Sequence, residues 1–354
     1  MLEKPVLLDL FPEELKAYLT ALGQPAFRAG QVFGWLHRGV PFGQMANLPR
    51  ELRDTLAAQA YDIPMTLHEA FPSRKDDTVK FLNACADGNL IESVLMHYRY
   101  GYTLCISTQV GCKMGCAFCA STLHGCVRNL SAGEMIAQVL LADRYLGQKG
   151  RVGHVVLMGS GEPLENYGQT VRFLRLVNHP DGLAISLRAV SLSTCGLAPQ
   201  IRQLADEGLP VTLSLSLHAP NDALRRQIMP VAGRYPLEEL MEAVRYYVKR
   251  TGRRAVFEYA LIDRFNSSLE HARELAQLLR GLQCHVNLIP LNRVPERSLM
   301  PASPAAVKAF LQTLEGLHIS ATCRREMGAD ISGACGQLRN RHLKKPEQAD
   351  TINQ

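Results

Sequence analysis

Strand-like and helix-like segments alternate from about residue 103 to residue 324, and this alternation constrains the fold more than any other feature. The strand-like runs are short and apolar, and most gaps between them carry a helical pattern of apolar residues. The runs are 103–108, 152–158, 189–193, 211–217, 256–262, 286–291 and 319–324. Repeated strand–helix units predict a parallel sheet. About six units predict an α/β fold built as a partial (β/α)6 barrel rather than a closed eight-fold one.

The residues before this alternation have a different character. Apolar residues at helical spacing mark three segments, which begin near Pro12, Phe27 and Pro49. Short strand-like pieces follow, and the last residues of the chain are polar and lack periodicity. We therefore expect a small helical accessory domain, a core domain and a flexible tail. The expected ranges are 1–97, 98–341 and 342–354.

Composition narrows the class of protein. The chain has 354 residues, of which 47% are hydrophobic, so it can bury a full core. It has no apolar run long enough to span a bilayer, and its first residues lack the basic and apolar regions of a signal peptide. We expect a cytoplasmic protein with no membrane partner. The net charge of +6 is compatible with a phosphate-rich partner.

Three of the ten cysteines form a Cx3CxxC triplet directly after the first strand-like run: Cys112, Cys116 and Cys119. In a reducing compartment, cysteines are expected in metal-binding or reactive roles rather than in structural disulfides. Thiolates hold iron–sulfur clusters, and three ligands on a cubane of four irons leave one iron open. Structural zinc sites close with four ligands. The alternatives are a chance clustering of cysteines or a zinc knuckle completed by a nearby histidine such as His124.

Polar signatures follow four further strands of the predicted sheet. They are 159–163 after the second run, 193–196 after the third, 216–218 at the end of the fourth and 290–292 after the sixth. The carboxyl ends of parallel strands meet on one face, where such folds gather their chemistry. We therefore expect these signatures and the cysteine triplet to form one site.

Four motifs together resemble a known family. They are the triplet, Met-Gly-Ser-Gly-Glu-Pro at 158–163, Ser-Leu-His-Ala-Pro-Asn-Asp at 216–222 and Gly-Ala-Cys-Gly-Gln-Leu at 333–338. The triplet is typical of the radical S-adenosylmethionine (SAM) superfamily. The last motif is similar to that of its RNA adenine C2-methyltransferases of the RlmN type. The resemblance extends over nearly the whole chain and implies a radical SAM barrel.

The resemblance implies two cofactors and their ligands. Cys112, Cys116 and Cys119 would bind a 4Fe–4S cluster whose open iron chelates SAM. Gly161 and Glu162 would contact the amino group of SAM. The rest of the SAM pocket is implied to consist of Ser193, Ser216, Leu217, His218 and Asn292.

The resemblance also implies a route to carbon 2 of adenine, an electron-poor aryl carbon for which direct methyl-cation transfer is implausible. Two SAM molecules would be used per turnover: one methylates Cys335, and the second yields a 5′-deoxyadenosyl radical that takes hydrogen from the S-methyl group. The methylene radical would add to carbon 2, Glu92 would accept a proton, and Cys105 would release the product by forming a disulfide. Without the resemblance, Cys105 is interpreted as a buried small residue and Glu92 as the polar face of a strand.

The implied substrates are an adenosine in the peptidyl-transferase centre of 23S rRNA and the adenosine 3′ of the anticodon in some tRNAs. The accessory domain would engage RNA, a flavodoxin or ferredoxin would donate electrons, and we expect a monomer. The nearest alternative is a Cfr-like enzyme that methylates carbon 8 of the same rRNA adenosine. Two further alternatives are a non-catalytic iron–sulfur or zinc protein that binds RNA and a radical SAM enzyme acting on a small molecule.

Overall fold

The computed structural model describes residues 3–325, 327–333 and 337, and its centre is a curved sheet of ten strands. Their order in the sheet is β1-β2-β3-β4-β7-β8-β9-β10-β11-β12. The bounds are β1 (Met65–Pro72), β2 (Val79–Cys85), β3 (Leu90–Tyr98), β4 (Gly101–Cys105), β7 (Val152–Leu157), β8 (Val190–Thr194), β9 (Thr212–Ser216), β10 (Ala255–Leu261), β11 (Cys284–Pro290) and β12 (Ala321–Cys323). A separate two-stranded sheet pairs β5 (Gln109–Gly111) with β6 (Cys126–Asn129).

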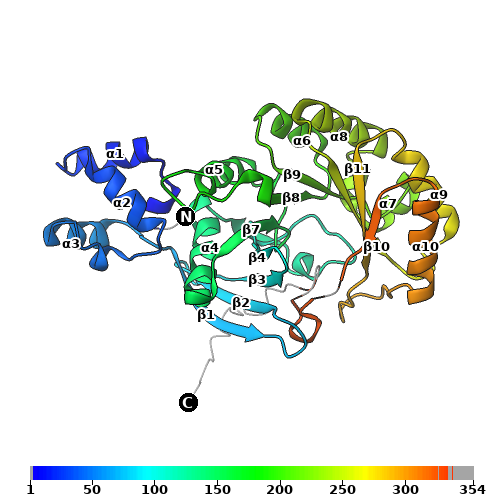
Figure 1. Ribbon diagram of the computed structural model, residues 1–354, viewed down its shortest axis with the longest axis horizontal. Helices are drawn as coiled ribbons and strands as arrows, with labels where there is room; N and C mark the ends of the chain where they lie inside the picture. Colours follow the sequence, from blue (N-terminus) through cyan, green and yellow to red (C-terminus); the bar gives the residue numbers. More distant parts are fainter. Residues whose placement is uncertain (1–2, 326, 334–336, 338–354) are drawn as a thin grey trace, which may run out of the picture.

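The sheet has a parallel part and an antiparallel part. From β4 through β7 to β12, every neighbouring pair is parallel, whereas β1 to β4 form an antiparallel meander. The parallel strands curve without closing, and helices lie along their outer side (Figure 1). This arrangement confirms the α/β partial barrel predicted from the alternation of strands and helices.

Ten α-helices lie within the described part of the chain. Their bounds are α1 (Pro12–Ala21), α2 (Arg28–Leu36), α3 (Arg50–Gln59), α4 (Ala132–Leu146), α5 (Tyr167–Val177), α6 (Ala198–Asp206), α7 (Asp222–Ile228), α8 (Leu237–Thr251), α9 (Leu269–Leu278) and α10 (Pro304–Gly316). Local sequence sets where several of them begin. The Ser131 hydroxyl accepts the Glu134 N–H while the Glu134 carboxylate accepts the Ser131 N–H, so α4 starts with a capping box.

The three N-terminal helices form a separate lobe beside α4 and α5 (Figure 1). A 3₁₀ turn (Leu7–Asp9) joins this lobe to the barrel, and its two leucines are fully buried. It can approach α4 closely because residue 133 is glycine: a Cβ there would lie 2.8 Å from Val6 and 2.9 Å from Leu8. The expected helical N-terminal region is confirmed.

The division into domains stays a prediction. The expected boundary at residue 97 falls within the β3–β4 hairpin, whose strands pair Tyr98 with Gly101. The strands of the meander that precede residue 97 therefore belong to the same sheet as the barrel strands that follow it. The predicted tail, 342–354, lies outside the described residues. In the described part of the chain, no helix combines the length and apolar character needed to cross a membrane.

Candidate active site

The cysteine triplet lies in the loop between β5 and β6. Cys112 and Cys116 are buried and Cys119 is half-buried. The loop is closed at its base, where the Cys112 N–H donates to the Gly125 carbonyl at 2.8 Å. Gly111 has φ +79°, and a Cβ there would lie 2.1 Å from the Gly125 oxygen, so only glycine allows this closure. The glycine before the first cysteine thus sets how tightly the loop folds back.

Burial favours the protonated form of the three thiols as long as no metal is bound. Burial raises the pKa of Cys112 to about 12 and also raises the pKa values of Cys116 and Cys119. A thiolate is the form that binds metal, and a bound cation stabilises it in such an environment. No group of three His, Cys, Asp or Glu side chains in the described residues converges as the ligands of a single metal ion do. A four-iron cluster does not require such convergence, because each thiolate bonds to a different iron.

These thiols line an open cavity at the carboxyl ends of the barrel strands. The space between its walls, counted together with the open solvent at its mouth, is about 940 Å³. Nine of the residues predicted to bind the cluster or SAM lie on its wall: Cys112, Cys116, Cys119, Gly161, Glu162, Ser193, Ser216, His218 and Asn292. The arrangement therefore brings the predicted ligands of the cluster and those of SAM to one cavity.

Glu162 anchors one wall of the cavity through backbone amides. Its carboxylate accepts the Cys195 N–H at 2.7 Å and the Leu164 N–H at 3.0 Å, and burial raises its pKa. Gly161 beside it has φ +113°, and a Cβ there would lie 2.6 Å from the Thr108 hydroxyl oxygen. The glycine lets this loop lie directly against residues 108 and 109, while Glu162 connects it to the loop after β8.

His218, two residues after the end of β9, has a backbone conformation that few residues adopt. Its φ is +57°, and its Nδ1 accepts the Ala260 N–H at 2.9 Å. Burial, with the nearby Arg225 cation as a second cause, lowers its pKa to about 3. The ring is therefore neutral at physiological pH, with the proton on Nε2. Leu217 is fully buried in the core and lies apart from the cavity wall, so only its backbone could serve a bound ligand.

Two buried charged residues of the site were not predicted from the sequence. Arg225 is fully buried and donates to the Cys195 carbonyl at 2.6 Å and the Leu217 carbonyl at 3.2 Å, which ties together the loops after β8 and β9. Glu258 lies on the cavity wall, accepts from Asn287 at 3.1 Å and has one carboxylate oxygen with no hydrogen-bond partner among the described residues. Glu258 could have been recognised from the sequence, because it is the only charged residue in the strand Ala255–Leu261.

Neither Cys105 nor Glu92 is on the wall of the cavity. Both are buried, Cys105 on β4 and Glu92 on β3. Cys105 packs in an apolar cluster with Val94, Met96, Val156 and Met158, and Met158 also lines the cavity. Met327, eight residues before Cys335, packs against the same cluster. Cys335 itself lies outside the described residues.

Comparisons with known proteins agree with this geometry. The sequence model of the radical SAM superfamily matches residues 106–279, and that of the ribosomal RNA large subunit methyltransferase N-terminal domain matches residues 6–61. A probable dual-specificity RNA methyltransferase RlmN of Alkaliphilus oremlandii is 51% identical, covering 97% of this chain and all of its own length. The protein of the same description from Clostridium tetani is 49% identical over 96% of this chain and 97% of its own. The crystal structure of a radical SAM methyltransferase from Sphaerobacter thermophilus matches with a TM-score of 0.93 at 45% identity, covering 95% of this chain and 99% of that one.

Proposed function

The chain belongs to the RlmN family of radical SAM RNA methyltransferases, and from this premise we propose that it methylates carbon 2 of adenosine. The proposed substrates are the adenosine in the peptidyl-transferase centre of 23S rRNA and the adenosine 3′ of the anticodon in some tRNAs. The observation that carries the proposal is the cavity in which three cysteine thiols meet Glu162, Ser193, Ser216 and His218. The enzyme uses a 4Fe–4S cluster and SAM.

The cluster and SAM, when bound, supply the methyl group and the one-electron chemistry that an unreactive aryl carbon requires. The chain's own residues have separate tasks. The triplet holds the cluster, and Gly161, Glu162, Ser193, Ser216, the backbone at Leu217, His218 and Asn292 orient SAM. Glu258 and Arg324 line the same cavity as an ion pair, with the Arg324 Nη1 3.9 Å from Glu258 Oε2, and that oxygen accepts no hydrogen bond from the described residues.

Three residues act on the methyl group and the adenine. Cys335 carries the methyl group as a thioether and then links the protein covalently to carbon 2. Glu92 takes the proton from carbon 2. The adduct gives up its unpaired electron to the one-electron acceptor that the oxidised cluster would supply. The Cys105 thiolate then attacks the sulfur of Cys335, the sulfur–methylene bond breaks with its electron pair on the methylene carbon, and that carbon takes up a proton, so that methylated RNA leaves as a disulfide forms between the two cysteines. Two observations support these tasks: Cys105 and Glu92 are both buried, and Cys105 packs with Met158 of the cavity wall.

RNA must present this adenine unpaired, because a base inside a helix hides its carbon 2 edge from a buried site. The N-terminal lobe matches the model of the ribosomal RNA large subunit methyltransferase N-terminal domain. We propose that this lobe engages RNA. We also propose that a flavodoxin or ferredoxin donates the electron, that the protein works as a monomer and that it is cytoplasmic.

Two cysteine variants test the order of the proposed steps. Cys335→Ala should keep the cluster and still cleave SAM to 5′-deoxyadenosine, but should not accept a methyl group from labelled SAM. Cys105→Ala should accept the methyl group and then remain covalently attached to RNA, which is visible as a slow band on a denaturing gel. If Cys105→Ala releases methylated RNA at the wild-type rate, the resolving task belongs to another group. Cys112→Ala is the control that loses the cluster and all activity.

A further inference from the structure

A lysine lies against the carboxylate of Glu92. The Lys80 Nζ is 3.1 Å from Glu92 Oε1, and the two side chains are only 14% and 10% exposed. An ion pair this well buried differs from the surface pairs of the molecule, such as Arg50 with Asp54, whose side chains are 88% and 72% exposed. Exposed pairs contribute little, whereas a buried ammonium strongly biases the charge of a carboxyl beside it.

Strand register places this pair on the face of the sheet that carries Cys105. Lys80 of β2 lies opposite Val94 of β3, and Val94 lies opposite Cys105 of β4. Residues directly opposite in antiparallel strands share a face, and Glu92 is two positions from Val94 on that face. Lys80, Glu92 and Cys105 therefore lie on one surface, which adjoins the cavity through the cluster that contains Met158.

Both members of the pair are held in place from other directions. The Glu92 carbonyl accepts the Ser107 hydroxyl at 2.6 Å, and the same hydroxyl oxygen accepts the Ser160 N–H at 3.0 Å. Glu92 is thus connected through one side chain to the loop that precedes Gly161. On the other side, the Lys80 ammonium lies 5.3 Å from the centre of the Phe71 ring. The backbone of Glu92 and the ammonium of Lys80 thus each have one further contact besides the ion pair.

We propose that Lys80 is a positioning residue that keeps Glu92 ionised and aimed at the carbon 2 proton of the adenine. The inference rests on the proposed function, because it assumes that Glu92 is the proton acceptor. Burial alone favours the neutral acid, which cannot accept a proton, and the adjacent ammonium favours the carboxylate. In the step itself the proton passes from carbon 2 to Glu92, and the electron pair of the broken C–H bond stays in the adenine ring. Lys80 acts only through Glu92 and does not touch the substrate.

The test measures how fast the covalent RNA–protein adduct forms and how fast it disappears. Lys80→Met removes the charge and keeps an unbranched apolar side chain, Lys80→Arg restores a cation, and Lys75→Met is the control on an exposed lysine of the β1–β2 turn. Each full-length protein carries its cluster and receives SAM, reductant and RNA. Lys80→Met should form the adduct at the wild-type rate but resolve it about 10²-fold more slowly, the scale of general-base catalysis. Lys80→Arg should recover most of the rate, and Lys75→Met should match the wild type.

Two further readouts separate this task from a merely structural one. RNA with deuterium at carbon 2 should resolve more slowly than unlabelled RNA, and the difference should be larger in Lys80→Met than in the wild type. The double variant Lys80→Met/Glu92→Gln should be no slower than Glu92→Gln alone, because Lys80 acts through Glu92.

Additive losses in the double variant would overturn the inference. So would equal losses of adduct formation and resolution in Lys80→Met, or resolution at the wild-type rate. A wild-type protein that methylates no adenine would overturn the proposed function as well, so the two failures are distinguishable.

Discussion

At the scale of single residues, His218 shows how burial fixes the state of a side chain. Its ring is neutral because the pKa falls to about 3, while its Nδ1 serves as the acceptor for the Ala260 N–H. A histidine in the unfolded chain takes up a proton near pH 6.5. Between about pH 6.5 and pH 3 the unfolded state therefore binds a proton that the folded state does not, and stability is lost as pH falls through this window.

The change His218→Asn tests this consequence. Asparagine tolerates the left-handed backbone at this position and offers a side-chain oxygen where Nδ1 stands. Lowering the pH from 7 to 5 should reduce the free energy of unfolding of the wild type by about 2 kcal/mol more than that of the variant. Urea unfolding of both proteins at the two pH values measures the difference. An identical pH dependence would mean that His218 is protonated equally in the folded and unfolded states.

Most individual residues of the site could be predicted from the sequence. Nine predicted ligands of the cluster or SAM line one cavity because they follow parallel strands, whose carboxyl ends meet on one face. Arg225 could not be identified in this way. Its carbonyl partners, Cys195 and Leu217, become neighbours only when the loops after β8 and β9 come together.

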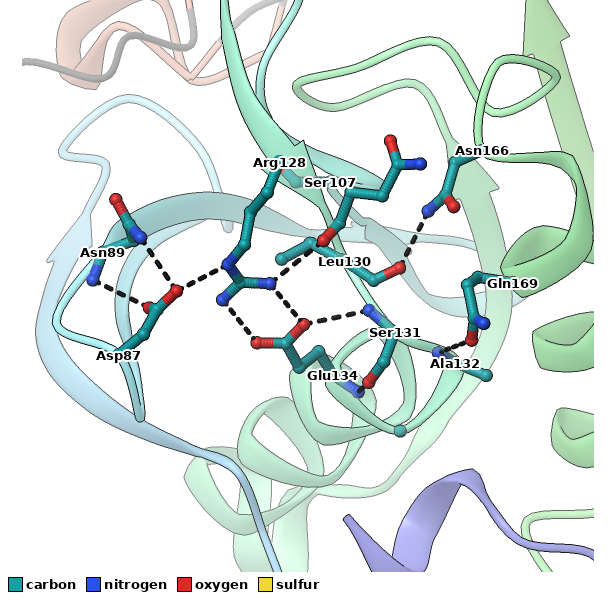
Figure 2. A network of polar contacts seen from close by, with 12 residues as sticks. Asp87, Asn89, Ser107, Arg128, Leu130, Ser131, Ala132, Glu134, Asn166 and Gln169 are labelled. Atoms are coloured by element: carbon teal, nitrogen blue, oxygen red, sulfur yellow. Dashed lines mark hydrogen bonds and ion pairs between the residues drawn. The ribbon is translucent and has the colours of Figure 1, made fainter. Parts of the chain in front are cut away.

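At the scale of elements, the start of α4 combines a local and a long-range feature. The capping box of Ser131 and Glu134 is readable from the sequence, because its residues are three positions apart. The same carboxylate also receives two hydrogen bonds from Arg128 of β6, both 2.8 Å long (Figure 2). Arg128 donates further to Asp87 in the β2–β3 turn at 2.5 Å. One guanidinium therefore connects the strand after the cluster loop to α4 and to the hairpin that carries Glu92.

Removing that guanidinium should destabilise the protein strongly. In Arg128→Met the Glu134 carboxylate, which is 1% exposed, loses its cation, and breaking a buried pair of this kind costs about 3–5 kcal/mol. Arg50→Met removes a pair that is almost fully exposed and should change stability by less than about 0.5 kcal/mol. Urea unfolding of the two variants measures both values. Equal, small effects would show that the network in Figure 2 contributes little to stability.

Element boundaries differ from the prediction where the site requires it. The strand predicted over 103–108 ends at Cys105. Beyond it the backbone leaves the sheet ladder, and the N–H groups of Thr108 and Gln109 both donate to the Ser160 carbonyl. The sequence keeps its β propensity through residue 108, but the N–H groups of Thr108 and Gln109 bond to the loop before Gly161 instead of to a neighbouring strand of the sheet. The end of the strand is therefore set by a contact more than fifty residues away.

At the scale of the whole molecule, the two ends of the sheet are connected by a segment that follows its last strand. After β12, the Gly328 N–H donates to the Asp76 carboxylate at 3.0 Å. Asp330 accepts from the Ser73 hydroxyl at 2.7 Å and from the Arg74 N–H at 2.9 Å. The segment before Cys335 is thus fastened to the turn between β1 and β2. No local pattern predicts this contact, because its partners are about 250 residues apart in the chain and each residue alone is an ordinary surface polar group.

The central claim is that this molecule directs the methyl group to carbon 2 of adenine, and one measurement tests it directly. The cluster-loaded protein is incubated with SAM, reductant and a 23S rRNA fragment that contains the peptidyl-transferase adenosine. The digested RNA is then compared by mass spectrometry with standards of 2-methyladenosine and 8-methyladenosine. The result expected here is 2-methyladenosine, absent when Cys335→Ala replaces the wild type. A product that co-elutes with 8-methyladenosine would contradict the claim and favour the Cfr-like alternative, and unmodified RNA together with SAM cleavage would contradict both.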